Sequence, residues 1–191
     1  MTAYLDPSAL AAAGRFSKLA WIGARRAAAA FASLLRREMH AGEPRPRVAA
    51  GAGARGDAET AVIFEMQDTV QGLIALLLPH DVCESVFSTL CPETDVSSPA
   101  GESALREVGN IVASQAVSAV ADHLGGRITL SVPILVTEGG GLIFDELLAE
   151  RREGRAGLVT EIELCESGER RGLLLFAPDA QQPRRSDTVR S

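Results

Sequence analysis

The pattern of apolar and polar positions divides the chain into long helical stretches and short strand-like runs. An alanine-rich stretch runs from Pro7 to about Met39. Asp6 followed by Pro7 is a typical helix start, with Asp at the N-cap and Pro at the first helical position. The segment "GEPRPR" ends this predicted helix, because proline cannot continue one. A short strand over 47–52 and the turn "ARGDAE" come next.

The following segment predicts an antiparallel hairpin. "TAVIFEMQ", which begins at Thr60, and "DTVQGLIALLLP" are rich in strand formers and are separated by a brief turn. The unbroken apolar run 73–78 predicts a strand that is buried on both faces. Residues 80–90 predict a short helix, and "CPETDVSSPAGE" predicts a loop that is rich in Pro and Ser.

The second half repeats this plan. A predicted helix covers about 101–124 and ends at Gly125-Gly126, a common C-terminal stop. A strand, "RITLSVPILVTE", a helix, "LIFDELLAERR", and a second hairpin, "GLVTEIELCES" with "RRGLLLFAPD" around Gly168, come after it. The polar tail over 181–191 predicts disorder.

The two halves therefore predict an internal duplication. With an offset of 86 residues, Ser17 aligns with Ser103 and Gly23 with Gly109. One repeat covers about 7–92 and the other about 98–180, within a single domain over 1–180. We expect an α+β fold with a pseudo-twofold axis: a six-stranded, mostly antiparallel sheet with long helices packed on it.

Composition narrows the class of protein. The net charge of −6 argues against nucleic-acid binding, because neutralising phosphates needs a basic surface. The three cysteines are odd in number and form no CxxC motif, which fits a reducing cytoplasm. The three histidines are scattered and predict no metal site. Neither a secretion signal nor a membrane span is visible, so we expect a soluble cytoplasmic protein that does not bind membranes.

The helix over 101–124 carries a polar stripe. At 100° per residue, one narrow arc contains Ser103, Glu107, Asn110, Ser114 and Ser118, while Leu, Val and Ala occupy the opposite arc. Glu107 and Asn110 are three residues apart, so their side chains lie side by side. Ile111 and Val117 flank the stripe and predict a surface on which something docks. Every amphipathic helix has a polar face, however, and this spacing alone does not define a function.

A longer pattern makes a functional interpretation of the stripe more specific. Ser103, three residues, Glu107, two residues, Asn110, twenty-two residues and Pro133 together resemble the signature of the CheC/CheX/FliY family of chemotaxis phosphatases. "LREVGNIVASQ", "ITLSVP" and "GLLLFAPD" are also similar to this family. The duplicated plan resembles CheC most, in which two such units form one monomer.

The resemblance implies that the protein hydrolyses the aspartyl phosphate of CheY, the chemotaxis response regulator. Asn110 would enter the regulator's active site and orient the attacking water, and Glu107 would contact the regulator and pair with its lysine. Ser103, Ile111 and Ser114 are the expected binding residues. The protein needs no cofactor of its own, because the magnesium and the phosphorylated Asp belong to the partner. CheD is a further candidate partner, and we expect a monomer or a weak dimer.

The first half departs from the signature. The aligned positions are Trp21 and Ala24, so the sequence predicts a degenerate first site and a single active site at Glu107 and Asn110. Pro46 is one residue away from the position where the alignment places the signature proline. Trp21 fits a buried core position as well as a binding role. Gly109 either lets the neighbouring backbone pack closely, which we favour, or gives room to a docked partner.

A non-catalytic binding or adaptor module of the chemotaxis or flagellar switch system, such as a CheD-binding regulator, is the second candidate function.

Overall fold

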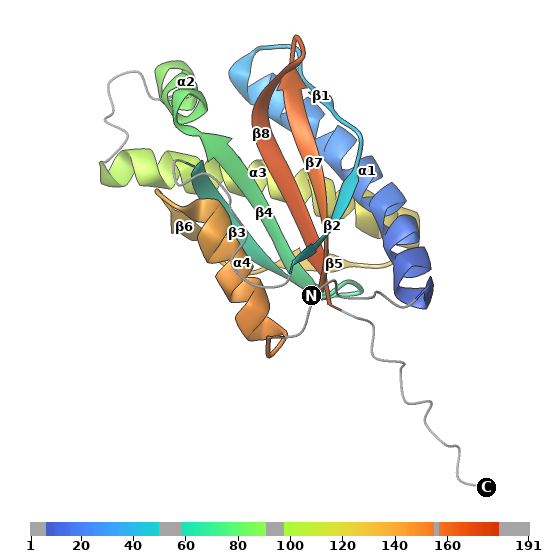
Figure 1. Ribbon diagram of the computed structural model, residues 1–191. Helices are drawn as coiled ribbons and strands as arrows, with labels where there is room; N and C mark the ends of the chain where they lie inside the picture. The colour runs from blue at the N-terminus through green and yellow to red at the C-terminus, as the bar shows by residue number, and fades with distance from the viewer. Residues whose placement is uncertain (1–6, 50–58, 91–97, 155–156, 180–191) are drawn as a thin grey trace, which may run out of the picture.

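The computed structural model describes residues 7–49, 59–90, 98–154 and 157–179, which form an α+β fold (Figure 1). The four helices are α1 (Pro7–Leu35), α2 (His80–Leu90), α3 (Pro99–Leu124) and α4 (Gly140–Arg151). The strands are β1 (His40–Ala41), β2 (Arg45–Ala49), β3 (Glu59–Asp68), β4 (Gly72–Pro79), β5 (Ile128–Leu130), β6 (Ile134–Val136), β7 (Gly157–Glu166) and β8 (Glu169–Pro178). The predicted fold class, both hairpins and the helix over 80–90 are confirmed.

The sheet has eight strands in the described part of the chain, where the sequence predicted six. They occupy six positions, because each edge position is divided between two short strands: β1 and β2 both pair with β7, and β5 and β6 both pair with β3. The four central strands follow the order β7-β8-β4-β3, and every pairing is antiparallel.

Both divided edges have the same cause, a bulge with one extra residue. Residues 42–44 lie opposite 162–163, and residues 131–133 lie opposite 64–65. In each bulge the first residue still donates to the sheet, with Gly42 N 2.8 Å from Glu163 O and Ser131 N 3.0 Å from Glu65 O. The third residue is Pro44 or Pro133, which has no N–H to donate and is tolerated at such bulges. Pro44, rather than Pro46, is therefore the counterpart of the signature proline Pro133.

The two halves of the chain exchange their edges. The edge strands β1 and β2 of the first half pair with β7 of the second, and β5 and β6 of the second half pair with β3 of the first. β4 and β8, one from each half, meet at the centre. The arrangement has the pseudo-twofold symmetry that the duplicated sequence predicts.

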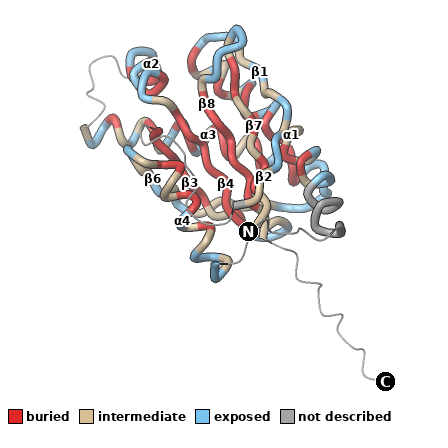
Figure 2. Tube along the Cα trace, in the orientation of Figure 1, coloured by how far each residue is buried: buried red, intermediate tan, exposed pale blue. Residues whose placement is uncertain are grey.

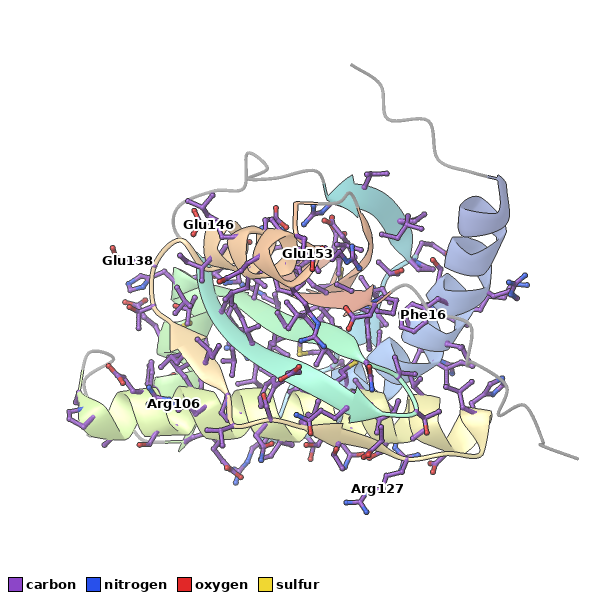
Figure 3. All side chains as sticks on the ribbon, turned by 90° about the horizontal axis from the view of Figure 1, so that it is seen from below. Phe16, Arg106, Arg127, Glu138, Glu146 and Glu153 are labelled. Atoms are coloured by element: carbon purple, nitrogen blue, oxygen red, sulfur yellow. The ribbon has the colours of Figure 1, made fainter. Side chains whose placement is uncertain are left out.

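The sheet lies between two unequal layers of helices (Figures 1 and 3). α1, α2 and α3 cover one face with the larger core, in which Phe31, Phe64 and Phe176 are fully buried. α4 covers the opposite face through Phe144 and Leu148. β4 and β8 run through the buried interior (Figure 2), which explains why apolar residues fill both faces of β4.

Three element boundaries differ from the sequence-based expectation. α1 ends at Leu35 rather than near Met39, because Arg36 adopts a positive φ of 54° and stops the helix before the prolines. The strand predicted over 47–52 is β2, which begins earlier, at Arg45, and the part of the prediction beyond Ala49 lies outside the described residues. The predicted strand over 127–138 is divided by the bulge at 131–133. Asp6 and the tail predicted to be disordered lie outside the described residues.

Candidate functional site

The site helix α3 is fixed at both ends by its own sequence. Ser98 is the N-cap and accepts a hydrogen bond from Gly101 N over 3.1 Å, and Pro99 follows as the first helical residue. At the other end Gly125 has a φ of 63°, the left-handed conformation that glycine adopts at least cost. The 26-residue helix therefore has a defined start and end.

The outer face of α3 presents the predicted polar stripe to solvent. Ser103, Glu107 and Asn110 are exposed, and Ser114 and Ile111 are half-buried. Figure 3 shows α3 alongside the sheet, with its outer side chains directed away from the strands. The expectation that Val117 is exposed beside the stripe is wrong, because Val117 is 3% exposed and belongs to the main core.

The polar groups of the stripe make few contacts within the protein. Ser103 Oγ donates to Pro99 O over 2.9 Å, so its hydroxyl serves its own helix. Ser114 Oγ donates to Asn110 Oδ1 over 3.4 Å, and this contact does not use the N–H groups of the Asn110 amide. The Glu107 carboxylate forms no hydrogen bond or ion pair with any residue that the structure describes. The neighbouring Arg106 pairs instead with Glu102, with 3.2 Å between Nη1 and Oε2.

The inner face explains the glycine between the two polar residues. Gly109 is buried, and a β-carbon there would lie 2.5 Å from Val62 Cγ1 and 2.6 Å from Val62 Cβ. The helix therefore approaches β3 more closely than any side chain would allow. Close packing on the sheet accounts for Gly109, as favoured from the sequence, and this packing also fixes the direction of the adjacent Asn110.

The first-half helix shows a different relation to α3 from the one that the sequence alignment predicts. Ala24 is fully buried, so it does not occupy a surface position like that of Asn110. The burial patterns of the two helices agree with an offset of 85 residues, which pairs the buried Ala24 with Gly109 and Phe31 with Ala116. By this offset we infer that Ile22 and Arg25, rather than Trp21 and Ala24, stand where Glu107 and Asn110 stand in α3. With either offset, the first half of the chain has neither a carboxylate nor an amide at the positions that correspond to Glu107 and Asn110.

Trp21 is partly a core residue, while the binding role considered for it stays a prediction. Its ring is half-buried and packs against the main core, and its Nε1 is buried with no hydrogen-bond partner in the described part of the protein. The guanidinium carbon of Arg25 lies over the ring, 5.2 Å from its centroid. Trp21 therefore contributes to the core from one side and carries an exposed cation on the other.

Sequence reasoning missed a groove next to the stripe. α1 crosses α3 where a β-carbon on Gly23 would lie 2.8 Å from Ala116 O, and beyond the crossing the two helices diverge. The resulting groove of about 400 Å³ is lined by Ile111 and Gln115 of α3 and by Arg26, Ala29 and Leu34 of α1, among others. The absence of Asp and Glu from α1 was the one signal in the sequence.

Two other kinds of feature, a metal centre and a membrane-spanning helix, are absent from the described residues. No group of three or more His, Cys, Asp or Glu side chains within residues 7–49, 59–90, 98–154 and 157–179 is placed to hold a metal ion. In the same ranges, no helix combines the length and apolar character needed to cross a bilayer.

These features define a class: an α+β protein of two fused units with exchanged edge strands and one outward-facing Glu/Asn pair. Residues 101–137 match the model of the CheC-like family, and this segment contains Glu107, Asn110 and Pro133. Over this segment the chain is similar to the CheC-like family, and the solved structures described next share its fold. A comparison with curated proteins gives no sequence match.

Solved structures share the fold over most of their length. FliY of Thermotoga maritima superposes with a TM-score of 0.64 at 17% identity and covers 91% of each chain. CheX from Vibrio vulnificus has a TM-score of 0.63 at 11% identity, covering 85% of this chain and 99% of that one. CheX from a Borrelia burgdorferi CheX–CheY–BeF3–Mg2+ complex has a TM-score of 0.58 at 16% identity, covering 83% and 96%. At these identities the likeness establishes the fold.

Proposed function

We propose that this protein hydrolyses the aspartyl phosphate of a CheY-type response regulator. The observation that carries the proposal is the exposed Glu107 and Asn110 pair, one helical turn apart on α3, with a carboxylate that no described residue engages. A similar fold, CheX, has been captured with CheY, beryllofluoride and magnesium, which supports a regulator as the partner.

The chemistry requires positioning more than covalent participation. Water attacks the phosphorus in line, the bond between phosphorus and the aspartyl oxygen breaks, and inorganic phosphate and a free carboxylate result. Asn110 has a donor and an acceptor in one neutral amide, so it can orient the water without repelling the phosphoryl group. The magnesium, the phosphorylated Asp and the lysine that Glu107 would contact all belong to the regulator. A hundredfold acceleration requires only about 2.7 kcal/mol of barrier lowering.

The test uses a CheY-type regulator encoded in the same genome and carrying a labelled aspartyl phosphate. The rate at which the regulator loses this labelled phosphate is measured with and without the protein. We expect Asn110→Ala to reduce the acceleration by about a hundredfold. Glu107→Ala should reduce it largely through weaker binding of the regulator. Ser118→Ala is the matched control, because Ser118 is exposed on the same helix two turns beyond Asn110.

Two results would contradict the proposal. Wild-type protein that leaves the regulator's dephosphorylation rate unchanged is not a phosphatase for it, and Asn110→Ala with full activity would remove the assigned role. If the protein bound a beryllofluoride-loaded regulator tightly but did not accelerate dephosphorylation of the phosphorylated form, the non-catalytic binding module would be the correct function.

A further inference from the structure

The groove between α1 and α3 adjoins the stripe that contains Asn110. Ile111 follows Asn110 directly and lines the groove, and Gln115, one turn further along α3, lines it as well. The facing wall on α1 includes two small, exposed residues, Ala29 and Ser33, beside the larger Arg26 and Leu34. A partner that contacts Asn110 therefore also meets this opening.

Arg26 places an unneutralised positive charge in the groove. Its Nε donates to Gln115 Oε1 over 3.2 Å, which holds the guanidinium against α3. No carboxylate among the described residues pairs with it. The surroundings add to the charge, because α1 contains four basic residues, Arg15, Lys18, Arg25 and Arg26, and no acidic one, although the whole chain has a net charge of −6.

We propose that the groove is the second half of the docking surface and that Arg26 contacts the anionic surface around the regulator's acyl phosphate. This inference rests on the proposed function. A phosphorylated aspartate is an anionic centre, and a guanidinium held by one hydrogen bond keeps donors free for carboxylate or phosphate oxygens. Arg26 acts as a docking residue, so its charge governs association with the regulator, while water positioning stays with Asn110.

Binding of a beryllofluoride-loaded CheY-type regulator, measured by titration calorimetry, tests the inference together with steady-state dephosphorylation. We expect Arg26→Gln to raise Kd and KM about three- to tenfold, with kcat within about twofold of wild type. Arg26→Glu should raise them further. The difference between wild type and Arg26→Gln should shrink at an ionic strength of about 0.5 M, where exposed charges are screened.

Three further variants separate charge, hydrogen bond and shape. Arg15→Gln removes the same charge from the same helix, eleven residues away or about 16 Å along its axis, and should leave Kd unchanged. Gln115→Ala removes the hydrogen bond and keeps the cation, so its effect should be smaller than that of Arg26→Gln. Ala29→Trp fills the groove from an exposed position and should raise Kd without unfolding the protein.

The results of these measurements distinguish failure of the groove inference from failure of the proposed phosphatase function. If wild type dephosphorylates the regulator but Arg26→Gln behaves like Arg15→Gln, the groove inference is overturned and the proposed function stands. If Gln115→Ala equals Arg26→Gln, the effect is structural and the inference is again overturned. If wild type neither binds the loaded regulator nor accelerates dephosphorylation, the proposed function fails and the inference fails with it.

Discussion

Replacing Gly109 by alanine tests how the site helix is held in place. The added β-carbon would lie 2.5, 2.6 and 2.8 Å from three atoms of Val62, all below the ~3.5–4.0 Å of an ordinary carbon–carbon contact. Val62 is fully buried in β3, and one of the three atoms is its Cβ, so a change of rotamer cannot relieve the clash. The helix or the strand must move by about 1 Å.

The magnitude follows from two opposed terms. Overpacking a tight core costs about 1–3 kcal/mol, while alanine gains about 1 kcal/mol over glycine in a helix interior. The result is a loss of about 1–2 kcal/mol in the free energy of unfolding, because three Val62 atoms are involved. Gly14→Ala is the control, since a β-carbon there meets nothing within 4 Å and should stabilise α1 by up to about 1 kcal/mol.

Urea denaturation of wild type, Gly109→Ala, Gly14→Ala, Val62→Ala and the Val62→Ala/Gly109→Ala double variant measures both terms. We expect Val62→Ala to relieve part of the clash in Gly109→Ala, so that the double variant is less destabilised than the sum of the single ones. Dephosphorylation should fall with stability, because the displacement acts on the residue next to Asn110. A Gly109→Ala protein as stable as Gly14→Ala would show that α3 does not rest on β3 as described.

Four other predictions concern buried or strained groups at three residues, Arg47, Cys83 and Gly125. Arg47 pairs with the fully buried Asp145, with 2.5 Å between Nη2 and Oδ1, so Arg47→Gln should cost about 3 kcal/mol in a denaturation assay, and an unchanged midpoint would contradict this. Burial raises the pKa of the Cys83 thiol above its ordinary value, so Cys83 should resist alkylation in the native protein, as read by mass spectrometry. Because the unfolded chain loses that proton first, the free energy of unfolding should fall above pH 9, less so in Cys83→Ala. Gly125→Ala should destabilise the C-terminus of α3 by about 1 kcal/mol, measurable by the same denaturation assay, since Gly125 has a φ of 63°.

The sequence was sufficient for features that depend on local pattern. The apolar run in β4 predicted a strand covered on both faces, and the helical period of α3 predicted that Glu107 and Asn110 face solvent. The end of α1 was predicted too late, because the prolines are a visible stop signal whereas the positive φ of Arg36 is not.

The sequence was insufficient where the contact partner lies on a distant segment. Gly23 and Gly109 suggested the offset of 86, yet Gly23 packs on α3 through Ala116 O and Gly109 packs on β3 through Val62. Their identity therefore does not mark equivalent positions, and the burial pattern replaces that offset by 85. The groove at Arg26 was missed for the same reason, because it exists only where α1 and α3 cross and diverge. Arg26 and Gln115, which meet there, are 89 residues apart in the sequence.

The exchange of edge strands explains why a half without a Glu/Asn pair remains necessary. α3 packs on β3, which belongs to the first half, and β3 is covered at its open edge by β5 and β6 of the second. The reciprocal contact places β1 and β2 against β7. Neither half can therefore complete its own sheet, and a truncated second half would expose the edges of both β7 and β8. We infer that the first half is maintained as the support of α3 and as the other wall of its groove. On this view, substitutions of the α1 residues that line the groove, such as Arg26 and Ala29, should change regulator binding, while substitutions on the buried face of α1 should change stability.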